Sequence, residues 1–407
     1  MKVLKSLKRI DPMGWAAILF AISFNLGIAS NSVGFALFVF VGIVMTLLDM
    51  RSAHVRKFSG RLNLPPIIFF VIIVMRELVA NPSYTLQIVN VYLAFLIVPL
   101  IVWFQTERLK FALKNILLAF LFGCVLNATV NIGLGIYRGV IANEQGINFW
   151  YLTYDLLSEP FGIQPIYQAL FYVFGVFILL DIGLLRKNKI LFYSIFALLA
   201  TSTILLAARN AIVCLVLLTP LFMLVKRKVT LKNLGILAAI LAVSFTIALQ
   251  NPVVKNRILK VNRSGNFFSG TSLRENIWGS ALFVAEKEFV WGVGEQKGEK
   301  LLLEQYEARN LKVPVEQKYH AHNQFLQTLV QYGVIGFLAL IMVFMYPLFH
   351  ASIYKKYLGL FWCLLFILTS LTESVFARQW GVFSYAFFAS LVLIDYETFK
   401  KGQKKYC

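Results

Sequence analysis

Residues 316–350 read EQKYHAHNQFLQTLVQYGVIGFLALIMVFMYPLFH, a polar run that ends at Asn323 and gives way to an apolar run. A membrane-spanning helix needs about 20 predominantly apolar residues, and the run at 323–350 is long enough. About twelve runs of comparable character occur along the chain, at approximately 14–30, 33–49, 64–80, 86–104, 112–136, 161–184, 190–208, 210–225, 234–250, 323–350, 358–376 and 381–396. The sequence therefore predicts an all-α integral membrane protein with about twelve transmembrane helices.

The composition supports this class. Of 407 residues, 59% are hydrophobic and only 14% are charged, whereas soluble domains average about 25% charged residues. An ordinary soluble enzyme is thereby excluded. The four cysteines are scattered without a C-x-x-C pair, so neither a disulfide framework nor a zinc site is expected.

The net charge of +20 has two possible sources, a nucleic-acid surface or positively charged cytoplasmic loops. If the N-terminus is cytoplasmic, the inner segments carry 24 of the 39 Lys and Arg residues. The short outer joints carry only Arg76, Arg138, Arg209 and Arg378. This asymmetry predicts that both termini are cytoplasmic, and no nucleic-acid partner is expected. The basic N-terminus has features of a cleavable signal, but the charge alternation requires that the first span is retained.

Three regions follow from this topology: a membrane bundle of about nine spans at 1–250, a large outer loop at 251–322, and the last spans with a cytoplasmic tail at 323–407. Within the loop, the S-x-x-E pattern of residues 272–275 predicts a capping box, which places Arg274 in the first turn of a helix extending to about Glu288. A turn at 292–294, a helix near 298–310 and a break at Pro314 follow. The loop is therefore expected to be mainly helical.

His322 is the first candidate for chemistry. It is followed, at steps of four, three, four and three residues, by Leu326, Leu329, Gly333 and Gly336. This spacing predicts that the histidine stands at the outer end of one face of the tenth span, above a smooth surface for helix packing. There an imidazole can accept a proton at neutral pH, or simply hydrogen-bond its neighbours. His320 is a weaker candidate, while His54 and His350 lie near the cytoplasmic side.

Two arginines on the outer side suggest an anionic ligand. Arg209 interrupts apolar sequence on both sides, and Arg274 is expected at a helix N-terminus, where backbone N–H groups favour anions. A diphosphate fits such groups better than a cation does. Candidates for supporting roles are His320, Asn323, Arg76, Arg138, Arg378 and Glu373. Among these, Arg76 is expected to be neutralised by Glu77 or another helix, and Arg378 to pair with Glu373.

Other chemistry is not supported. The outer loops contain no D-x-D or E-x-D pattern, and the chain has no P-loop, G-x-S-x-G, H-E-x-x-H or G-x-G-x-x-G motif. No metal and no cofactor is therefore expected.

The layout and the motifs together resemble a known family. About twelve spans and one large loop late in the chain are combined with Ser-Leu-Arg-Glu (272–275), Trp-Gly-Val-Gly (291–294) and His-Ala-His-Asn-Gln-Phe-Leu (320–326). Gly333 and Gly336 follow. This combination is similar to the O-antigen ligase and polymerase superfamily.

The resemblance implies a GT-C-like, inverting, metal-independent glycosyltransferase of the bacterial inner membrane, whose active site faces the periplasm. It implies His322 as the catalytic base, with Arg274 and Arg209 as the arginines that bind the diphosphate. Many members read Ser-Arg-Gly where this chain has Ala208-Arg209-Asn210. The implied donor is a glycan on undecaprenyl diphosphate, the implied acceptor is lipid A-core, and membrane lipids surround the protein.

Several functions share this layout. A ligase moves finished glycan onto lipid A-core, a polymerase extends the carrier-linked chain, and a protein O-oligosaccharyltransferase is a third variant. The chain length and the single late loop favour the ligase. A polyprenyl-glycan flippase or transporter is the alternative from another class, but it predicts charged residues near the bilayer middle, whereas the polar residues here concentrate at the outer edge.

Overall fold

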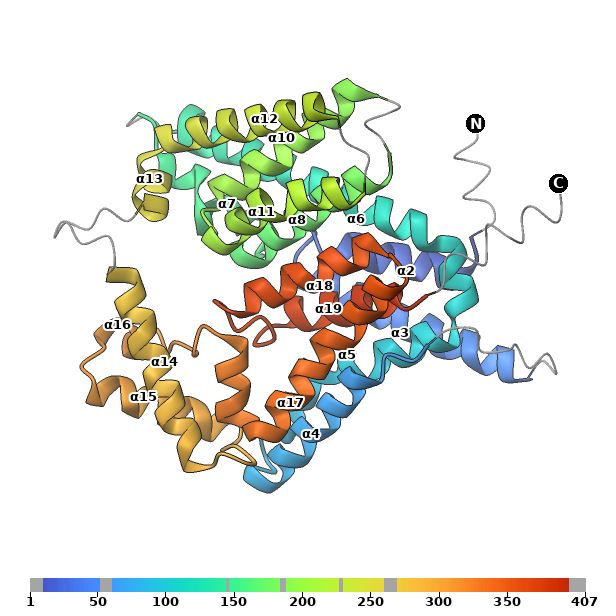
Figure 1. Cartoon of the computed structure of the whole chain (residues 1–407), viewed down its shortest axis with the longest axis vertical. Helices are drawn as coiled ribbons and strands as arrows, with labels where there is room; N and C mark the ends of the chain where they lie inside the picture. Colours follow the sequence, from blue (N-terminus) through green and yellow to red (C-terminus); the bar gives the residue numbers. More distant parts are fainter. Residues whose placement is uncertain are drawn as a thin grey trace. The chain divides into compact units, whose positions relative to one another are not determined.

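The computed structural model describes residues 10–51, 61–143, 146–183, 188–226, 230–259 and 269–394. The regular elements in these ranges are helices, and Figure 1 shows their course. Each of the twelve predicted runs contains one α-helix: α2 (Pro12–Ser23), α3 (Ile28–Arg51), α4 (Leu64–Ala80), α5 (Thr85–Phe104), α6 (Thr106–Ile136), α8 (Pro165–Asp181), α10 (Lys189–Leu205), α11 (Arg209–Val225), α12 (Leu231–Gln250), α17 (Gln324–Ile353), α18 (Tyr357–Ser370) and α19 (Gln379–Val392). The prediction of an all-helical chain is confirmed for the described residues.

Within the described residues, five helices are long and apolar enough to cross a membrane: Ile28–Arg51, Thr85–Phe104, Thr106–Ile141, Lys232–Gln250 and Gln324–Ile353. A sixth span is possible if Tyr154–Phe161 and Pro165–Asp181, which are bent by 77° at their junction, form one broken span. The protein is therefore a multi-pass membrane protein. Shorter apolar helices account for most of the remaining runs, and the count of twelve spans stays a prediction.

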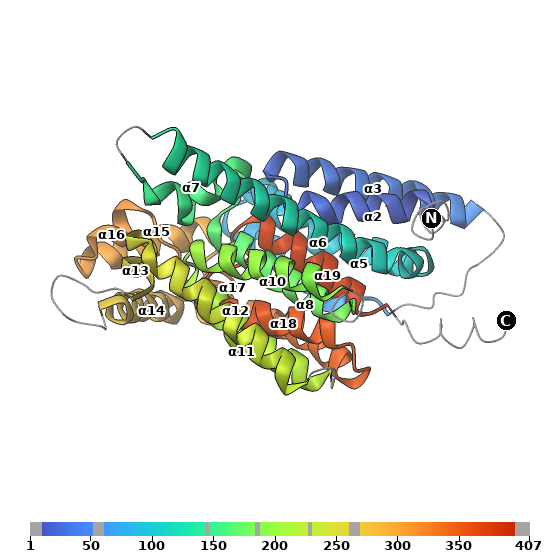
Figure 2. The same ribbon diagram turned by 90° about the horizontal axis from the view of Figure 1, so that it is seen from above.

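The helices form two compact units that interleave along the chain. The first contains Met1–Gly60, Phe104–Lys260 and Ile394–Cys407, and the second contains Arg61–Trp103 and Val261–Leu393. Within the first unit, α2 packs along α3 and α6 (Figure 2). The second unit holds α4, α5, α17, α18 and α19 together with those helices of the large loop that follow residue 261, whereas α13 (Pro252–Leu259) belongs to the first unit.

The large loop is folded around its own apolar core in the second unit. Its helices there are α14 (Ser269–Lys287), α15 (Glu295–Ala308) and the short α16 (Lys312–Glu316). Ile277, Ala281 and Val284 recur at steps of four and three residues, so they share one face of α14, and all three are buried. Leu302 and Tyr306 of α15 complete the same cluster. Burial of one large aliphatic or aromatic side chain stabilises a fold by about 1.5–3 kcal/mol.

The large loop leads into the membrane helices through α17, and this helix is broken at Gly333. Gly333 has φ 60° and ψ −164°, which separates residues 324–332 from residues 334–353. The second part alone gives a helix of about 30 Å, which matches the thickness of a bilayer's hydrocarbon core. The predicted continuous helical face from His322 to Gly336 is therefore wrong, because backbone that is not helical at Gly333 interrupts the 3.6-residue period.

The segment 289–294 is paired with the break through four backbone hydrogen bonds. The N–H groups of Val293 and Gly294 donate to the carbonyls of Val330 and Gln331 at 3.0 and 2.8 Å, and those of Val334 and Ile335 donate to Phe289 and Val290 at 2.8 and 3.4 Å. Residues 292–294 are therefore more than the simple turn that their glycines predict.

Glycine at two positions makes this approach possible. A Cβ on Gly292 would lie 2.4 Å from the backbone of residues 331–333, and a Cβ on Gly333 would lie 2.3 Å from the carbonyl oxygen of Val290. Both glycines also have positive φ. The small residues expected to allow helix packing serve instead, at Gly333, to admit a loop backbone.

The start of α14 also differs from the prediction. The helix begins at Ser269, three residues before the expected capping box at 272–275. Arg274 therefore lies in the second turn, where the free N–H groups of the helix end no longer surround it. The predicted helix near 298–310 is present as α15. The predicted break at Pro314 is misplaced, because the chain turns at residues 309–311 and Pro314 lies inside α16, which starts at Lys312.

Candidate functional site

His322 stands on the loop immediately before α17. Asn323 is the N-cap of that helix, and its side-chain oxygen accepts hydrogen bonds from the backbone N–H groups of Phe325 and Leu326 at 2.9 and 3.1 Å. His322 itself has φ 47°, a left-handed conformation that turns the chain away from the helix axis. The imidazole is thus presented beside the helix end, and not on its apolar face.

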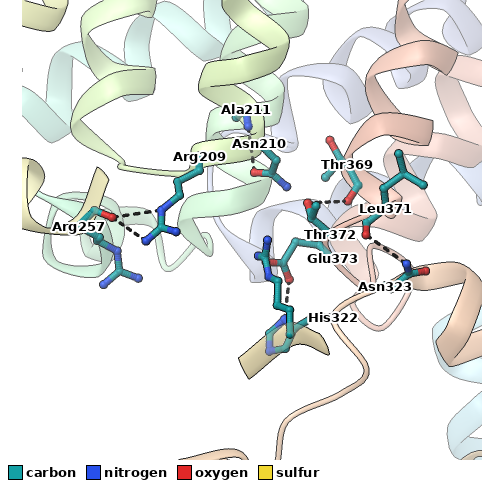
Figure 3. Close-up of polar contacts among 11 residues, drawn as sticks. Arg209, Asn210, Ala211, Arg257, His322, Asn323, Thr369, Leu371, Thr372 and Glu373 are labelled. Carbon is teal, nitrogen blue, oxygen red and sulfur yellow. Dashed lines mark hydrogen bonds and ion pairs between the residues drawn. The ribbon is translucent and has the colours of Figure 1, made fainter. Parts of the chain in front are cut away.

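Glu373 is the closest charged partner of this histidine. Its Oε2 lies 3.1 Å from Nδ1 of His322 (Figure 3). Glu373 follows α18, and the amide of Asn323 donates to the carbonyl of Leu371 in the same turn at 3.2 Å. The imidazole and the ring of Tyr319 also form a T-shaped contact at 4.8 Å between centroids. Glu373 and Tyr319 therefore both contact the ring of His322.

Arg274 approaches the other oxygen of the same carboxylate. Its Nη2 is 3.9 Å from Oε1 of Glu373, and 41% of its side chain is exposed. The second unit thus brings together a histidine, a carboxylate and an arginine that is still accessible to an anion. These residues come from the start of α17, the turn after α18 and the second turn of α14.

His320 has a different environment. Its Nδ1 lies 3.8 Å from Oε1 of Glu299. Burial lowers the pKa of His320 to about 4, and the positive charge of Arg378 acts in the same direction. Burial raises the pKa of Glu299, which Arg378 and Lys318 oppose. His320 is therefore neutral at pH 7 and lies beside His322 as an uncharged neighbour.

Arg378 is exposed at the N-cap position of α19 and does not pair with Glu373. Among the described residues, Glu373 forms its ion pairs with Arg274 and His322. The predicted Arg378–Glu373 pair is wrong, because the fold places Arg274 and His322 beside that carboxylate instead.

Arg76 and Glu77, near the C-terminal end of α4, both contact the large loop. The Arg76 guanidinium donates through Nη2 and Nε to the carbonyl oxygen of Gly292 at 2.6 and 3.0 Å. Glu77, which is fully buried, accepts from the backbone N–H of Glu295 at 2.6 Å, at the first residue of α15. The hydrogen bonds of Arg76 are therefore directed at a backbone carbonyl, while its charge also acts on the neighbouring Glu77.

The pKa of Glu295 is raised at this junction. Burial raises its pKa to about 7, and the negative charges of Glu299 and Glu77 add to the effect. Its Oε2 accepts a hydrogen bond from the hydroxyl of Tyr332 at 3.1 Å. Neither Glu295 nor Glu299 is evident from the sequence, because both lie in an ordinary amphipathic helix with many charges.

The remaining candidate arginines belong to the first unit. Arg209 is the first residue of α11, after a sharp turn at Ala207 with φ 50°, and its guanidinium donates to the carbonyl of Arg257 at 2.7 and 3.1 Å (Figure 3). Arg138 pairs with Glu159 at 2.8 Å, and both side chains are largely exposed. His54 lies outside the described residues, and His350 is buried in α17.

Metal ligands are not grouped in the part of the chain that the structure describes: no three His, Cys, Asp or Glu side chains there could hold one ion. The three described cysteines, Cys124, Cys214 and Cys363, are free and buried. The groups available for chemistry are thus an imidazole, carboxylates and guanidinium groups.

The chain combines apolar helices of membrane length with a polar site, at which a histidine and an arginine of the large loop meet a carboxylate that follows α18. These features define a multi-pass membrane protein with an enzyme-like polar site. Residues 191–341 match the model of the family described as O-antigen ligase. This match supports the O-antigen ligase and polymerase superfamily, whose members are glycosyltransferase-like membrane enzymes of lipopolysaccharide biosynthesis that use polysaccharide or lipid-linked substrates.

A protein of Haemophilus influenzae described as uncharacterized is 24% identical to this chain over 118 residues. The matched segment is 29% of this chain and 30% of the relative. The chain therefore aligns with less than a third of that relative's length.

Proposed function

We propose that the protein transfers an O-antigen glycan from undecaprenyl diphosphate to a sugar hydroxyl of lipid A-core at the periplasmic face of the inner membrane. The observation that carries this proposal is the single carboxylate of Glu373 between His322 and Arg274. A proton acceptor and an anion-binding group that share one small site are what a glycosyl transfer from a diphosphate requires.

In the proposed reaction, His322 removes the proton from the acceptor hydroxyl. The oxygen's electron pair forms a bond to the anomeric carbon of the donor sugar from the face opposite the leaving group. The bond between that carbon and the phosphate oxygen breaks, and its electron pair leaves with undecaprenyl diphosphate. Arg274 and Arg209 stabilise the developing negative charge, and the reaction inverts the anomeric configuration without a metal.

The topology proposed for this enzyme is twelve spans in a GT-C-like arrangement, with both termini in the cytoplasm. The loop at 251–322 then lies in the periplasm, between bundles at 1–250 and 323–407. The excess of basic residues in the inner segments supports this orientation.

Two variants test the assigned residues. His322→Ala and Arg209→Ala should each lower transfer by about 10² to 10³, because each removes one group that the proposed reaction assigns to catalysis. Lys297→Ala, which removes an exposed cation of α15, is the control and should retain transfer. Transfer at the control rate by either variant, at equal membrane expression, contradicts its assignment.

A deletion strain distinguishes the ligase from the related functions. Lipopolysaccharide gels with analysis of carrier lipids should show full-length glycan left on the carrier and core without O-antigen. Core that bears a single repeat would indicate a polymerase instead, and glycan accumulated in the cytoplasmic leaflet would indicate a flippase. Normal lipopolysaccharide with an unmodified glycoprotein would indicate a protein O-oligosaccharyltransferase.

A further inference from the structure

The hydrogen bond between His322 and Glu373 determines which ring nitrogen is available. An ionised carboxylate can only accept hydrogen bonds, so the proton of the neutral imidazole must be on Nδ1, 3.1 Å from Oε2 of Glu373. The lone pair is then on Nε2, on the opposite side of the ring. The carboxylate thereby selects Nε2 as the nitrogen that can receive a proton.

Glu373 lies on a turn that is fastened to the start of α17 on both sides. Before it, the carbonyl of Leu371 accepts from the amide of Asn323 at 3.2 Å. After it, the backbone N–H of Phe376 donates to the side-chain oxygen of Gln324 at 2.7 Å. The backbone N–H of Glu373 also bonds back to Thr369 of α18 at 3.0 Å.

The two residues that directly follow His322 therefore hold the turn that carries its carboxylate. Gln324 is buried, as are Val375 and Phe376 at the far end of the turn, whereas the carboxylate of Glu373 and the imidazole remain partly exposed. Such an arrangement locates the pair accurately and leaves it open to a substrate.

The charges that face His322 come from several elements. Glu373 is the one in hydrogen-bond contact, and Arg274 of α14 reaches the far oxygen of that carboxylate at 3.9 Å. The neutral His320 lies nearby with Arg378 and Glu299 beyond it, while Tyr319 presents only its ring. The negative charge nearest to the imidazole is thus Glu373.

We propose that Glu373 is the positioning residue of this site, which holds His322 in the tautomer whose Nε2 takes the acceptor's proton and steadies the imidazolium that results. Its second oxygen orients Arg274 toward the same point. This inference rests on the proposed function, in which His322 is the general base. It adds Glu373 as the residue that fixes the tautomer of that base.

Glu373→Gln tests the inference in the purified full-length protein, with a lipid-linked glycan donor and lipid A-core. The amide keeps the shape but loses the charge, and its NH₂ group can favour the wrong tautomer. Turnover at optimal pH should fall by about 10-fold to 100-fold, as for other residues that orient a functional histidine. Because a carboxylate favours the protonated imidazole, its removal should also move the acid limb of the pH–rate profile to lower pH.

Two further variants separate positioning from folding. Glu373→Asp keeps the charge, so it should recover part of the turnover and return the acid limb toward its wild-type position. Glu307→Gln removes an exposed carboxylate of α15 and should leave both rate and profile unchanged. A purely structural role would lower the amount of folded enzyme without moving the acid limb.

The outcomes distinguish the two proposals. If His322→Ala is inactive while folded Glu373→Gln has the turnover and acid limb of wild type, the positioning role is wrong and the general base stands. If folded His322→Ala is fully active, the proposed base itself fails. A lower turnover with an unmoved acid limb likewise overturns the role of Glu373.

Discussion

Replacing Gly333 by alanine should disrupt the junction between the large loop and α17. The residue has φ 60° and ψ −164°, a conformation essentially limited to glycine. An added Cβ would lie 2.3 Å from the carbonyl oxygen of Val290, 2.4 Å from its carbon and 2.6 Å from the nitrogen of Gly292. All three atoms belong to the backbone, so no side chain can rotate out of the way.

The expected loss of stability has two parts, backbone strain at residue 333 and broken hydrogen bonds at the junction. The backbone conformation costs about 1–3 kcal/mol for a residue other than glycine. Relieving the contact separates residues 289–294 from α17 and so breaks their four hydrogen bonds, at about 1 kcal/mol each. The junction should therefore lose about 5–7 kcal/mol, while the membrane helices keep their own packing.

The assay is limited proteolysis of the full-length protein in lipid nanodiscs, together with thermal unfolding. Gly133→Ala is the matched control, because Gly133 lies within α6 and a Cβ there meets no atom within 4 Å. The control should gain up to about 1 kcal/mol from better helix propensity. New cleavage near residues 288–295 is expected only in Gly333→Ala. If Gly333→Ala resists protease and heat as the control does, glycine is not required at position 333 for the pairing of residues 289–294 with α17.

Three further effects are expected. Arg76→Met leaves the carbonyl of Gly292 without its donor and should lower the free energy of unfolding by about 1–3 kcal/mol, which is measured as a lower melting temperature. An unchanged melting temperature would show that water replaces the guanidinium. Glu295→Gln should remove a pH dependence: the pKa of Glu295 is raised from 4.5 to about 7, so its stabilisation is complete below about pH 4.5 and is lost as the pH rises through 7. At pH 8 this variant should be more stable than wild type by up to about 3 kcal/mol, and equal stability at pH 8 would contradict the shift. Arg138→Gln breaks an exposed ion pair with Glu159 and should change the free energy of unfolding by less than about 1 kcal/mol, so a larger loss would indicate a role beyond that pair.

The positions of the helices could be read from the sequence because they depend on local composition. A run of apolar residues in a lipid environment must satisfy its own backbone hydrogen bonds, and the α-helix does so within the run. Each predicted run accordingly contains one helix. The start of α14 was misplaced by three residues, since a capping box depends on only four residues and is easily matched inside a helix.

The sequence does not predict the break of α17, although it marks Gly333 as a residue suited to close packing. Glycine in an apolar run is compatible with a packed helix, a kink or a close backbone approach, and the residues nearby do not distinguish them. The deciding partner, segment 289–294, lies about forty residues earlier in the chain. The need for glycine at position 292 is evident only from the folded structure, in which a Cβ there would contact the backbone of residues 331–333.

The membrane class of this protein, the places of its helices and a short set of candidate residues follow from local sequence, because hydrophobic length and charge are local properties. The contacts within each unit depend instead on the tertiary fold. It paired Glu373 with His322 and Arg274, and it directed Arg76 at Gly292. Ion pairs and hydrogen bonds act over a few ångströms, so their choice depends on which distant segments the fold places side by side.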